Sequence, residues 1–372
     1  MKILALVESR DHVCCRYRVR AFESTLAASG WSLAIEPLAR GVFRRLLQLR
    51  EAAGYDAVLL QRKLLPAWQL GELRRRARRL IFDFDDAVLY RDSNDRRGPH
   101  DRRRADRFKR TVCLADQVIA GNAFLADCAI QAGAEAKRVQ VIPSCIAAGP
   151  PAPRPRIGRE GGIDLTWIGS AGTLAGLERQ RPLWERLGRE FAGLRLRMIC
   201  DRFPRLDPLP VVEVPWSEAS EEAEIASADV GISWIPDDLW SRGKCGLKIL
   251  QYQAAGLPVL ANPVGVHPEF IRHGVDGFLA TTDEEWIEAI RILSGDRSLR
   301  EAMGREARKS LVDRHSVEAW AATFLESIQG PGKSSEPARF APRPAGLALF
   351  HHRTSGRSSD LTRPPRHSKT TT

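Results

Sequence analysis

The fold of this chain is decided by the stretch Asp229-Val-Gly-Ile-Ser-Trp-Ile-Pro236 and, after a short loop, Gly243-Lys-Cys-Gly-Leu-Lys-Ile-Leu-Gln-Tyr-Gln-Ala-Ala-Gly-Leu-Pro-Val-Leu-Ala-Asn-Pro-Val264. Val230 to Ile235 is a short apolar run, which is typical of a buried parallel strand. From Lys244 to Ala255 the apolar residues recur at helical spacing, and Gly256 ends this predicted helix. The stretch therefore predicts strand, helix and strand of a parallel sheet.

The polar face of the predicted helix carries Lys244, Lys248 and Gln251. The helix begins at the carboxyl end of a strand, which is where open parallel sheets bind their ligands. Free N–H groups and two positive charges at that end suit an anion, such as a phosphate or diphosphate. The alternative is an ordinary amphipathic helix with two solvated lysines.

The segment Ala254-Ala-Gly-Leu-Pro-Val-Leu-Ala261 resembles the end of the donor-binding helix and the next strand in GT-B glycosyltransferases of the group 1 family. This resemblance implies sugar transfer from a nucleotide-sugar, with retention of configuration. It makes Lys248 and Lys244 the catalytic pair that stabilises the departing diphosphate. It also puts Gly246, Gln251 and Tyr252 on the donor side of the site.

Two positions depart from the family pattern, which usually has two glutamates eight residues apart. The matching positions here are Gly243 and Gln251. The amide of Gln251 can still bind ribose hydroxyls, but Gly243 has no side chain to contact the transferred sugar. One rival function follows from this departure, namely a glycosyltransferase-like binding protein without catalysis.

The rest of the chain alternates strands and helices, which predicts an α/β fold of two doubly wound parallel-sheet, Rossmann-like domains facing a cleft. A Pro-rich linker at 147–162 separates an acceptor-side domain (1–146) from a donor-binding domain (163–315). A last helix at 316–329 is expected to cross back to the first domain. Residues 330–372 are expected to form a disordered basic tail.

Further donor-side candidates follow strands of the second domain. Gly169 and Ser170 belong to a small-residue loop after the first strand, where a backbone approaches a phosphate closely. Trp216 follows a later strand, at an edge that meets the nucleotide base in the resembled family, so the resemblance implies a base contact. The alternative is a core residue.

The first domain places five acceptor-side candidates after its strands: Arg16, Arg18, Asp85, Asp86 and Asn122. The two arginines face a phosphate or an acidic acceptor, or they belong to a solvated helix start. The aspartates serve the acceptor or a loop, or they cap local structure. No other ligands converge on them, so no metal site is predicted.

The excess of positive charge is local. The net charge of the 372 residues is +11, and residues 91–110 (net +5) and 331–372 (net +6) account for all of it. Residues 91–110 are either a solvated helix face or a contact for an anionic membrane surface. They contain Phe108 as their one aromatic residue, so no stacking platform for nucleic acid is predicted. A nucleic-acid-binding protein therefore remains only the weaker rival.

Composition sets the remaining expectations. The seven cysteines have no metal-type spacing, and no apolar run has the roughly 20 residues of a membrane span. We expect a cytoplasmic enzyme without a cofactor, located in the cytoplasm or peripherally on the inner face of the membrane. Its partners would be a nucleotide-sugar donor and a glycan or lipid-linked acceptor.

Overall fold

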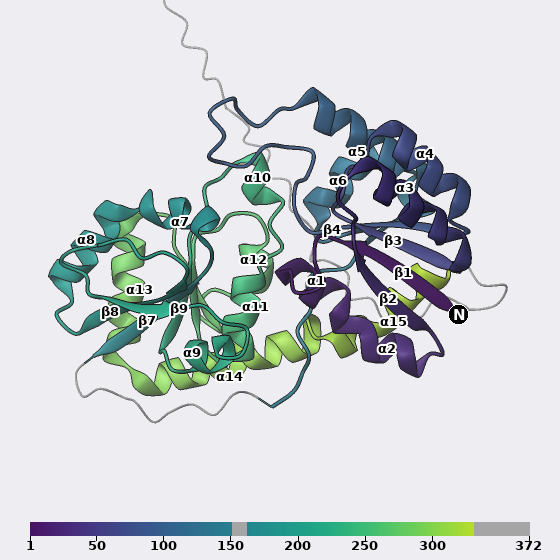
Figure 1. Cartoon of the computed structure of the whole chain (residues 1–372). Coiled ribbons are helices and arrows are strands. Elements are labelled where there is room, and N and C mark those ends of the chain that lie inside the picture. The colour runs from purple at the N-terminus through teal and green to yellow at the C-terminus, as the bar shows by residue number, and fades with distance from the viewer. Residues whose placement is uncertain (151–161, 331–372) are drawn as a thin grey trace, which may run out of the picture. The chain divides into compact units, whose positions relative to one another are not determined.

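The computed structural model describes residues 1–150 and 162–330, and it contains two six-stranded parallel sheets (Figure 1). The predicted α/β fold with two doubly wound sheets is confirmed. Residues 151–161 of the predicted linker and 331–372 of the predicted tail lie outside the described ranges. Every strand pairing within the two sheets is parallel.

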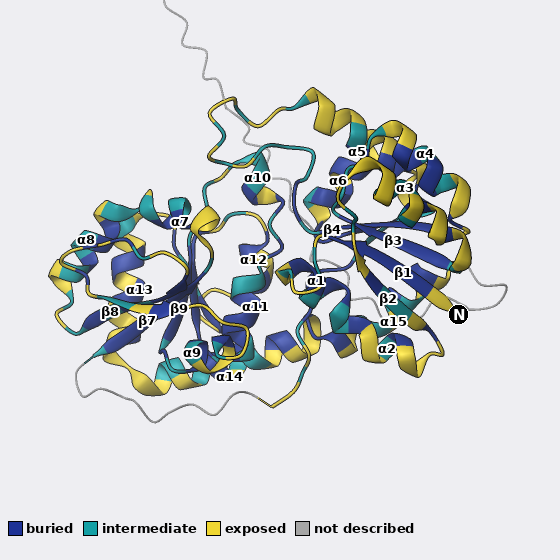
Figure 2. Ribbon diagram, in the orientation of Figure 1, coloured by how far each residue is buried: buried dark blue, intermediate teal, exposed yellow. Residues whose placement is uncertain are grey.

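The first sheet is covered on both faces, because its strands present apolar side chains to both (Figure 2). Its strands lie in the order β2 (Ser32–Pro37), β1 (Lys2–Val7), β3 (Ala57–Gln61), β4 (Leu80–Phe84), β5 (Gln117–Ala120) and β6 (Val139–Val141). One face packs on α3 (Val42–Glu51), α4 (Ala67–Arg76), α5 (Arg102–Leu114) and α6 (Ala123–Gln131). The other packs on α1 (Val13–Arg18), η1 (Arg20–Phe22), α2 (Glu23–Ala28) and α15 (Val317–Gln329).

The second sheet is built in the same way. Its order is β12 (Gly277–Leu279), β11 (Val259–Ala261), β10 (Val230–Ser233), β7 (Ile163–Ile168), β8 (Leu194–Cys200) and β9 (Val211–Pro215). One core contains side chains of α7 (Ala171–Glu178), α8 (Arg181–Glu190) and α13 (Asp283–Gly295). The other contains side chains of α9 (Glu221–Ala226), α11 (Leu247–Ala254), α12 (His267–Phe270) and α14 (Arg297–Arg314).

The last helix of the described residues, α15, packs in the core of the first sheet rather than the second. Phe324 stacks on Phe22 of η1, with ring centroids 4.0 Å apart. Arg79 donates a hydrogen bond of 3.0 Å to the carbonyl of Ser327. The described part of the chain therefore begins and ends in the first domain.

The helix predicted from Lys244 to Ala255 begins only at Leu247, which corrects the sequence analysis. Gly246 has a φ of 64°, and this left-handed residue separates α11 from the short α10 (Leu239–Arg242). Lys244 therefore lies in a turn before the helix and not on its face. In the ranges that the structure describes, no helix is long and apolar enough to cross a membrane.

Candidate functional site

The amino-terminal end of α11 is open because its first residue outside the helix is a glycine. Gly246 has no side chain that accepts hydrogen bonds from the first turn, and no side chain caps the helix. A Cβ at this position would lie 2.8 Å from atoms of Val266 and Phe270, so close packing and left-handed backbone both require glycine. The first N–H groups of α11 are therefore left for a ligand or solvent.

Lys248 lies in the first turn of α11 as a half-buried ammonium without an acidic partner. Its Nζ lies 4.3 Å from the ring centroid of Trp167, a cation–π contact. Among the described residues no hydrogen bond or ion pair to this Nζ is found. Burial, and then repulsion by Lys244, lower the pKa of Lys248 to about 7. The site therefore contains a positive charge that lacks its counter-ion.

Lys244, the other predicted catalytic lysine, is already paired. Its Nζ lies 2.7 Å from Oδ1 of Asp86, which belongs to the first domain, and 4.6 Å from the ring centroid of Trp240. The two lysines therefore do not form the matched pair on one helix face that the sequence predicted. Lys244 connects the two domains, whereas Lys248 is unpaired.

The loop predicted to hold the diphosphate, at Gly169 and Ser170, is largely satisfied within the protein. The N–H of Ser170 donates to Oγ1 of Thr173 at 3.1 Å, and the N–H of Ala171 donates to Oδ1 of Asp201 at 2.8 Å. A Cβ at Gly169 would lie 2.4 Å from the Trp167 ring that Lys248 also contacts. The loop therefore borders the Lys248 site, but the N–H groups of Ser170 and Ala171 are already hydrogen-bonded within the protein.

Gln251 and Trp216 meet a buried glutamate that the sequence analysis did not single out. Nε1 of Trp216 donates to Oε2 of Glu221 at 2.8 Å. Nε2 of Gln251 donates to the hydroxyl of Tyr17 at 3.3 Å, and that hydroxyl donates to Oε1 of Glu221 at 3.0 Å. Glu221 stands in a run of acidic and small residues, so only the fold distinguishes it from its neighbours.

Arg16 belongs to the same group, whereas Tyr252 does not. Arg16 pairs with Glu221 at 2.8 Å and with Glu218 at 3.1 Å, so its partners are acids of the second domain. Tyr252 is fully buried. Its hydroxyl donates to the carbonyl of Ile232 and accepts from the N–H of Ile168. The structure therefore places Tyr252 in the core and not on the donor side of the site.

Arg18 is likewise a core residue, which corrects its assignment to the acceptor side. It is 3% exposed, and its guanidinium binds both carboxylate oxygens of Asp83 at 2.6 to 3.0 Å. A further N–H donates to the carbonyl of Ile142. The guanidinium therefore connects strand ends of the first sheet, and its N–H groups are not available to an acceptor substrate.

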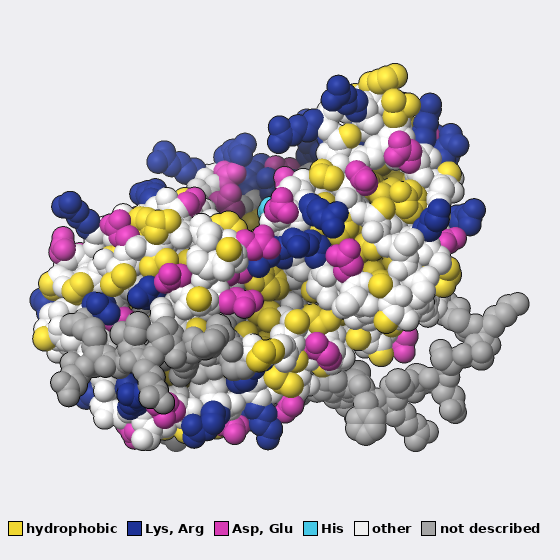
Figure 3. Space-filling model, turned by 60° about the horizontal axis from the view of Figure 1, so that its bottom comes forward, with side chains coloured by type: hydrophobic (Ala, Val, Ile, Leu, Met, Phe, Trp, Pro, Cys, Tyr) yellow, Lys and Arg dark blue, Asp and Glu magenta, His cyan; other side chains and the backbone are white. Residues whose placement is uncertain are grey.

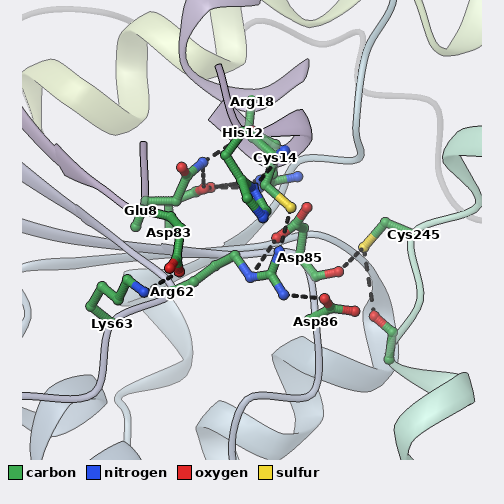
Figure 4. A network of polar contacts seen from close by, with 12 residues as sticks. Glu8, His12, Cys14, Arg18, Arg62, Lys63, Asp83, Asp85, Asp86 and Cys245 are labelled. Carbon is green, nitrogen blue, oxygen red and sulfur yellow. Dashed lines mark hydrogen bonds and ion pairs between the residues drawn. The ribbon is translucent and has the colours of Figure 1, made fainter. Parts of the chain in front are cut away.

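Arg62 organises the acidic loop after β4, and the sequence analysis missed it. Figure 4 shows its side chain between Cys14 and the pair Asp85 and Asp86. Its φ of 58° is the left-handed value that few residues other than glycine adopt. Burial opposes ionisation of Asp85, but Arg62 and Arg18 outweigh it and hold the pKa of that carboxyl below its usual value. The network therefore favours the charged form of the Asp85 carboxylate at the sheet edge.

The turn from Arg242 to Cys245 is docked on the first domain. Asn122 caps α6, and its side-chain amide donates to the carbonyls of Arg242 and Lys244 at 3.2 and 3.1 Å. A Cβ on Gly243 would lie 2.6 Å from Cβ of Ala87 and 2.8 Å from its backbone nitrogen. The glutamate usual in the resembled family therefore does not fit at Gly243 in this arrangement.

A cavity of about 410 Å³ lies between helices of the two sheets. It adjoins Arg16, Tyr17 and Gln251, together with Ala254 and Arg308 of the second domain. Such a volume is within the range of small-molecule sites. Lys248 and Gly169 do not line it. Among the described residues, no group of His, Cys, Asp or Glu is arranged to hold a metal ion.

Comparison with known proteins gives one family and several solved structures. Residues 240–310 match the family model described as glycosyl transferases group 1. The structure of HepE from Anabaena in complex with UDP-glucose is 17% identical, with a TM-score of 0.61, and the alignment covers 88% of this chain and 99% of that one. Sucrose-phosphate synthase from Thermosynechococcus elongatus is 15% identical, with a TM-score of 0.64 and coverage of 88% and 98%. A glycosyltransferase from Rickettsia africae is 13% identical, with a TM-score of 0.64 and coverage of 88% and 97%.

No curated protein sequence matches the chain significantly. The solved structures share its two-sheet fold over nearly their whole length. The family segment runs from α10 to α14 and contains Lys244, Lys248 and Gln251.

Proposed function

We propose that this chain, a GT-B glycosyltransferase whose residues 240–310 match the group 1 family, moves a sugar from a nucleotide-sugar donor to a glycan or lipid-linked acceptor. The observation that carries the proposal is the unpaired, half-buried ammonium of Lys248 at the open end of α11. A diphosphate supplies both the charge and the hydrogen-bond acceptors that this end of the helix lacks. That HepE has been solved with UDP-glucose supports a nucleotide-sugar as the donor.

In the proposed reaction, the bond between the sugar and the nucleoside diphosphate breaks while the acceptor oxygen attacks, with retention of anomeric configuration. Negative charge develops on the departing diphosphate. Lys248 and the first N–H groups of α11 stabilise this charge from a fixed position, so they act more strongly in the transition state than on the bound donor. Lys244 repels the charged form of Lys248, and the negative charge of a bound diphosphate offsets that repulsion.

The nucleoside end of the donor would lie toward Gln251 and Trp216. The indole N–H of Trp216 is held by Glu221 while the residue stays 44% exposed, so a ring face remains open to a base. Gln251 is turned toward Tyr17 in this structure, so the ribose competes with that tyrosine for the amide.

The acceptor side of the proposal rests on Asp85 and Asp86, which Arg62 holds at the carboxyl edge of the first sheet. An acceptor hydroxyl approaching that edge meets carboxylates that can orient it by accepting its hydrogen bond. A membrane surface reached through residues 91–110 is part of the same proposal.

The test is a panel of UDP-, GDP- and ADP-sugars, first for binding by thermal shift and calorimetry and then for release of nucleoside diphosphate. We expect nucleotide-sugars of one nucleotide class to raise the melting temperature of the protein. Their sugar should be transferred to water slowly or to an acceptor, with release of the nucleoside diphosphate. If none of the panel binds, the proposed donor site is wrong.

A second candidate is favoured by Gly243, whose contact with Ala87 leaves no room for a sugar-contacting side chain. In that case the chain binds a nucleotide-sugar without turning it over. Tight donor binding with no turnover in the presence of candidate acceptors would support this second function.

A further inference from the structure

The first turns of α3, α4 and α5 lie together on one face of the first sheet (Figure 1). Arg45 at the start of α3 donates to Oε1 of Gln69 in α4 at 3.4 Å. Arg107 of α5 donates at 3.4 Å to the carbonyl of Leu64, which shortly precedes α4. Residues from three separate stretches of sequence therefore form one surface.

Large apolar side chains project from this surface into solvent. Val42 and Phe43 in the first turn of α3 are 62% and 74% exposed, and Leu47 in its second turn is 44% exposed. Trp68 in the first turn of α4 is 52% exposed. Single exposed apolar residues need no explanation, but a group of four with two aromatic rings indicates something that covers them.

Arginines without acidic partners lie beside the apolar group. A depression of about 430 Å³ is lined by Pro66 and Ala67 of the α4 start and by Arg102, Arg103, Asp106, Arg107 and Arg110 of α5. Within the described parts of the chain these four arginines have no ion pair, whereas Arg91 pairs with Asp101 and Arg97 with Asp95. On the face drawn in Figure 3, by comparison, Lys and Arg side chains are interspersed with Asp and Glu.

We propose that the first turns of α3, α4 and α5 are a docking surface for an anionic phospholipid membrane. Phe43 and Trp68 enter the boundary between headgroups and acyl chains, and the arginine-lined depression takes a headgroup phosphate. This proposal refines the membrane part of the proposed function and does not depend on the transfer reaction. A second copy of the chain fits less well, because it would bring the same uncompensated arginines.

The position of the surface has a consequence for the acceptor. Each of the three helices follows a strand of a parallel sheet, so their first turns lie at the carboxyl edge, where Asp85 and Asp86 also lie. A membrane held there presents a lipid-linked acceptor at the edge that carries the two carboxylates.

The experiment is sedimentation of the full chain with vesicles of phosphatidylcholine alone or with about 30% of the anionic lipid phosphatidylglycerol. We expect binding only to the anionic vesicles. Arg103→Glu with Arg110→Glu should weaken it about tenfold or more, because each basic residue contributes strongly near such a surface. Phe43→Ser with Trp68→Ser should weaken it also at high salt, since apolar insertion is not screened.

Matched controls are Arg305→Glu with Lys309→Glu on α14, which change the charge equally, and Ile292→Ser, which removes another exposed apolar side chain. Both should bind vesicles like the unchanged chain. All variants keep residues 331–372, so any contribution of that basic segment is the same in each.

Three outcomes would overturn the proposal. The first is equal loss of vesicle binding in the α14 control, and the second is no loss in the α5 variant. The third is concentration-dependent self-association without vesicles that the Phe43 and Trp68 changes abolish, because a second copy then covers the surface. Donor affinity by calorimetry is measured on the same variants, so a failure of docking remains distinct from a failure of the proposed function.

Discussion

At the scale of single residues, Lys248 and Lys244 differ in what surrounds them rather than in type. Asp86 neutralises Lys244, whereas Lys248 lies over Trp167 with no acid nearby in the described chain. A half-buried ammonium without a counter-ion is costly for the fold, and such costs are common where a ligand completes the site. The unpaired residue is therefore the better candidate for contact with a phosphate.

Replacing Lys248 by alanine should weaken donor affinity about 10- to 100-fold, because a charge-assisted hydrogen bond to phosphate contributes roughly 1.5–3 kcal/mol. Calorimetry with the best donor of the panel measures this loss. Lys109→Ala, an exposed lysine of α5, is the matched control and should bind the donor normally. Unchanged affinity in Lys248→Ala would mean that the phosphate sits elsewhere.

The lowered pKa of Lys248 predicts how donor affinity varies with pH. Below about pH 7 Lys248 is already protonated in the free protein, so its protonation does not limit donor affinity. A bound diphosphate raises the pKa, so between pH 7 and that higher value affinity should fall, by at most about tenfold per pH unit. Binding at pH 8 should take up a proton, which calorimetry in buffers of different ionisation enthalpy detects.

Lys248→Arg is the control for this pH profile, because arginine stays protonated throughout the range. Its donor affinity should lack the fall above pH 7. The same fall in Lys248→Arg would assign the titration to another group.

At the scale of elements, the turn between α10 and α11 connects the two sheets. The turn contributes no strand to either sheet. It is contacted by three residues of the first domain, namely Asn122, Asp86 and Ala87. Gly243 is required because a side chain would clash with Ala87. It is not required for a left-handed backbone, since its φ and ψ are right-handed helical. The turn thus sets how closely α11 approaches the acidic edge of the first sheet.

Gly243→Ala should therefore destabilise the protein by about 1–3 kcal/mol, because the added Cβ meets backbone atoms that cannot move alone. Chemical unfolding monitored by circular dichroism measures the change. Gly71→Ala in α4 is the control, since a Cβ there meets nothing within 4 Å and alanine favours a helix. An equal increase in the free energy of unfolding for both changes would show that the turn does not pack against Ala87 in solution.

At the scale of the whole molecule, α15 makes the end of the described chain part of the core of its beginning. Val317, Phe324 and Ile328 are buried against residues of β1, η1 and α2. Unfolding of the first sheet therefore involves α15, and the two sheets do not correspond to two independent halves of the described chain.

Phe324→Ala should destabilise the chain by about 3–5 kcal/mol, the usual cost of truncating a buried phenylalanine. It removes the ring stacked on Phe22. Phe43→Ala makes the same chemical change at an exposed position and should leave the free energy of unfolding almost unchanged. Equal small effects at both positions would mean that α15 does not stay docked.

The sequence by itself determined the alternation of strands and helices, the two sheets and the segment that matches the group 1 family. These features depend on apolar spacing and on Gly and Pro signals within a few residues, so they can be predicted without knowing distant contacts. The choice of Lys248 as a site residue also came from such local spacing on one helix.

The tertiary structure alone decided which charged residues are free. Lys244 meets Asp86 from 158 positions away, and Arg18 meets Asp83 from 65 positions away. It also placed Tyr252 in the core and Gly243 against Ala87. Pairing and burial depend on which distant atoms come within a few ångströms, and a local pattern carries no information about them because the same lysine or glycine fits a helix, a turn or an interface equally well.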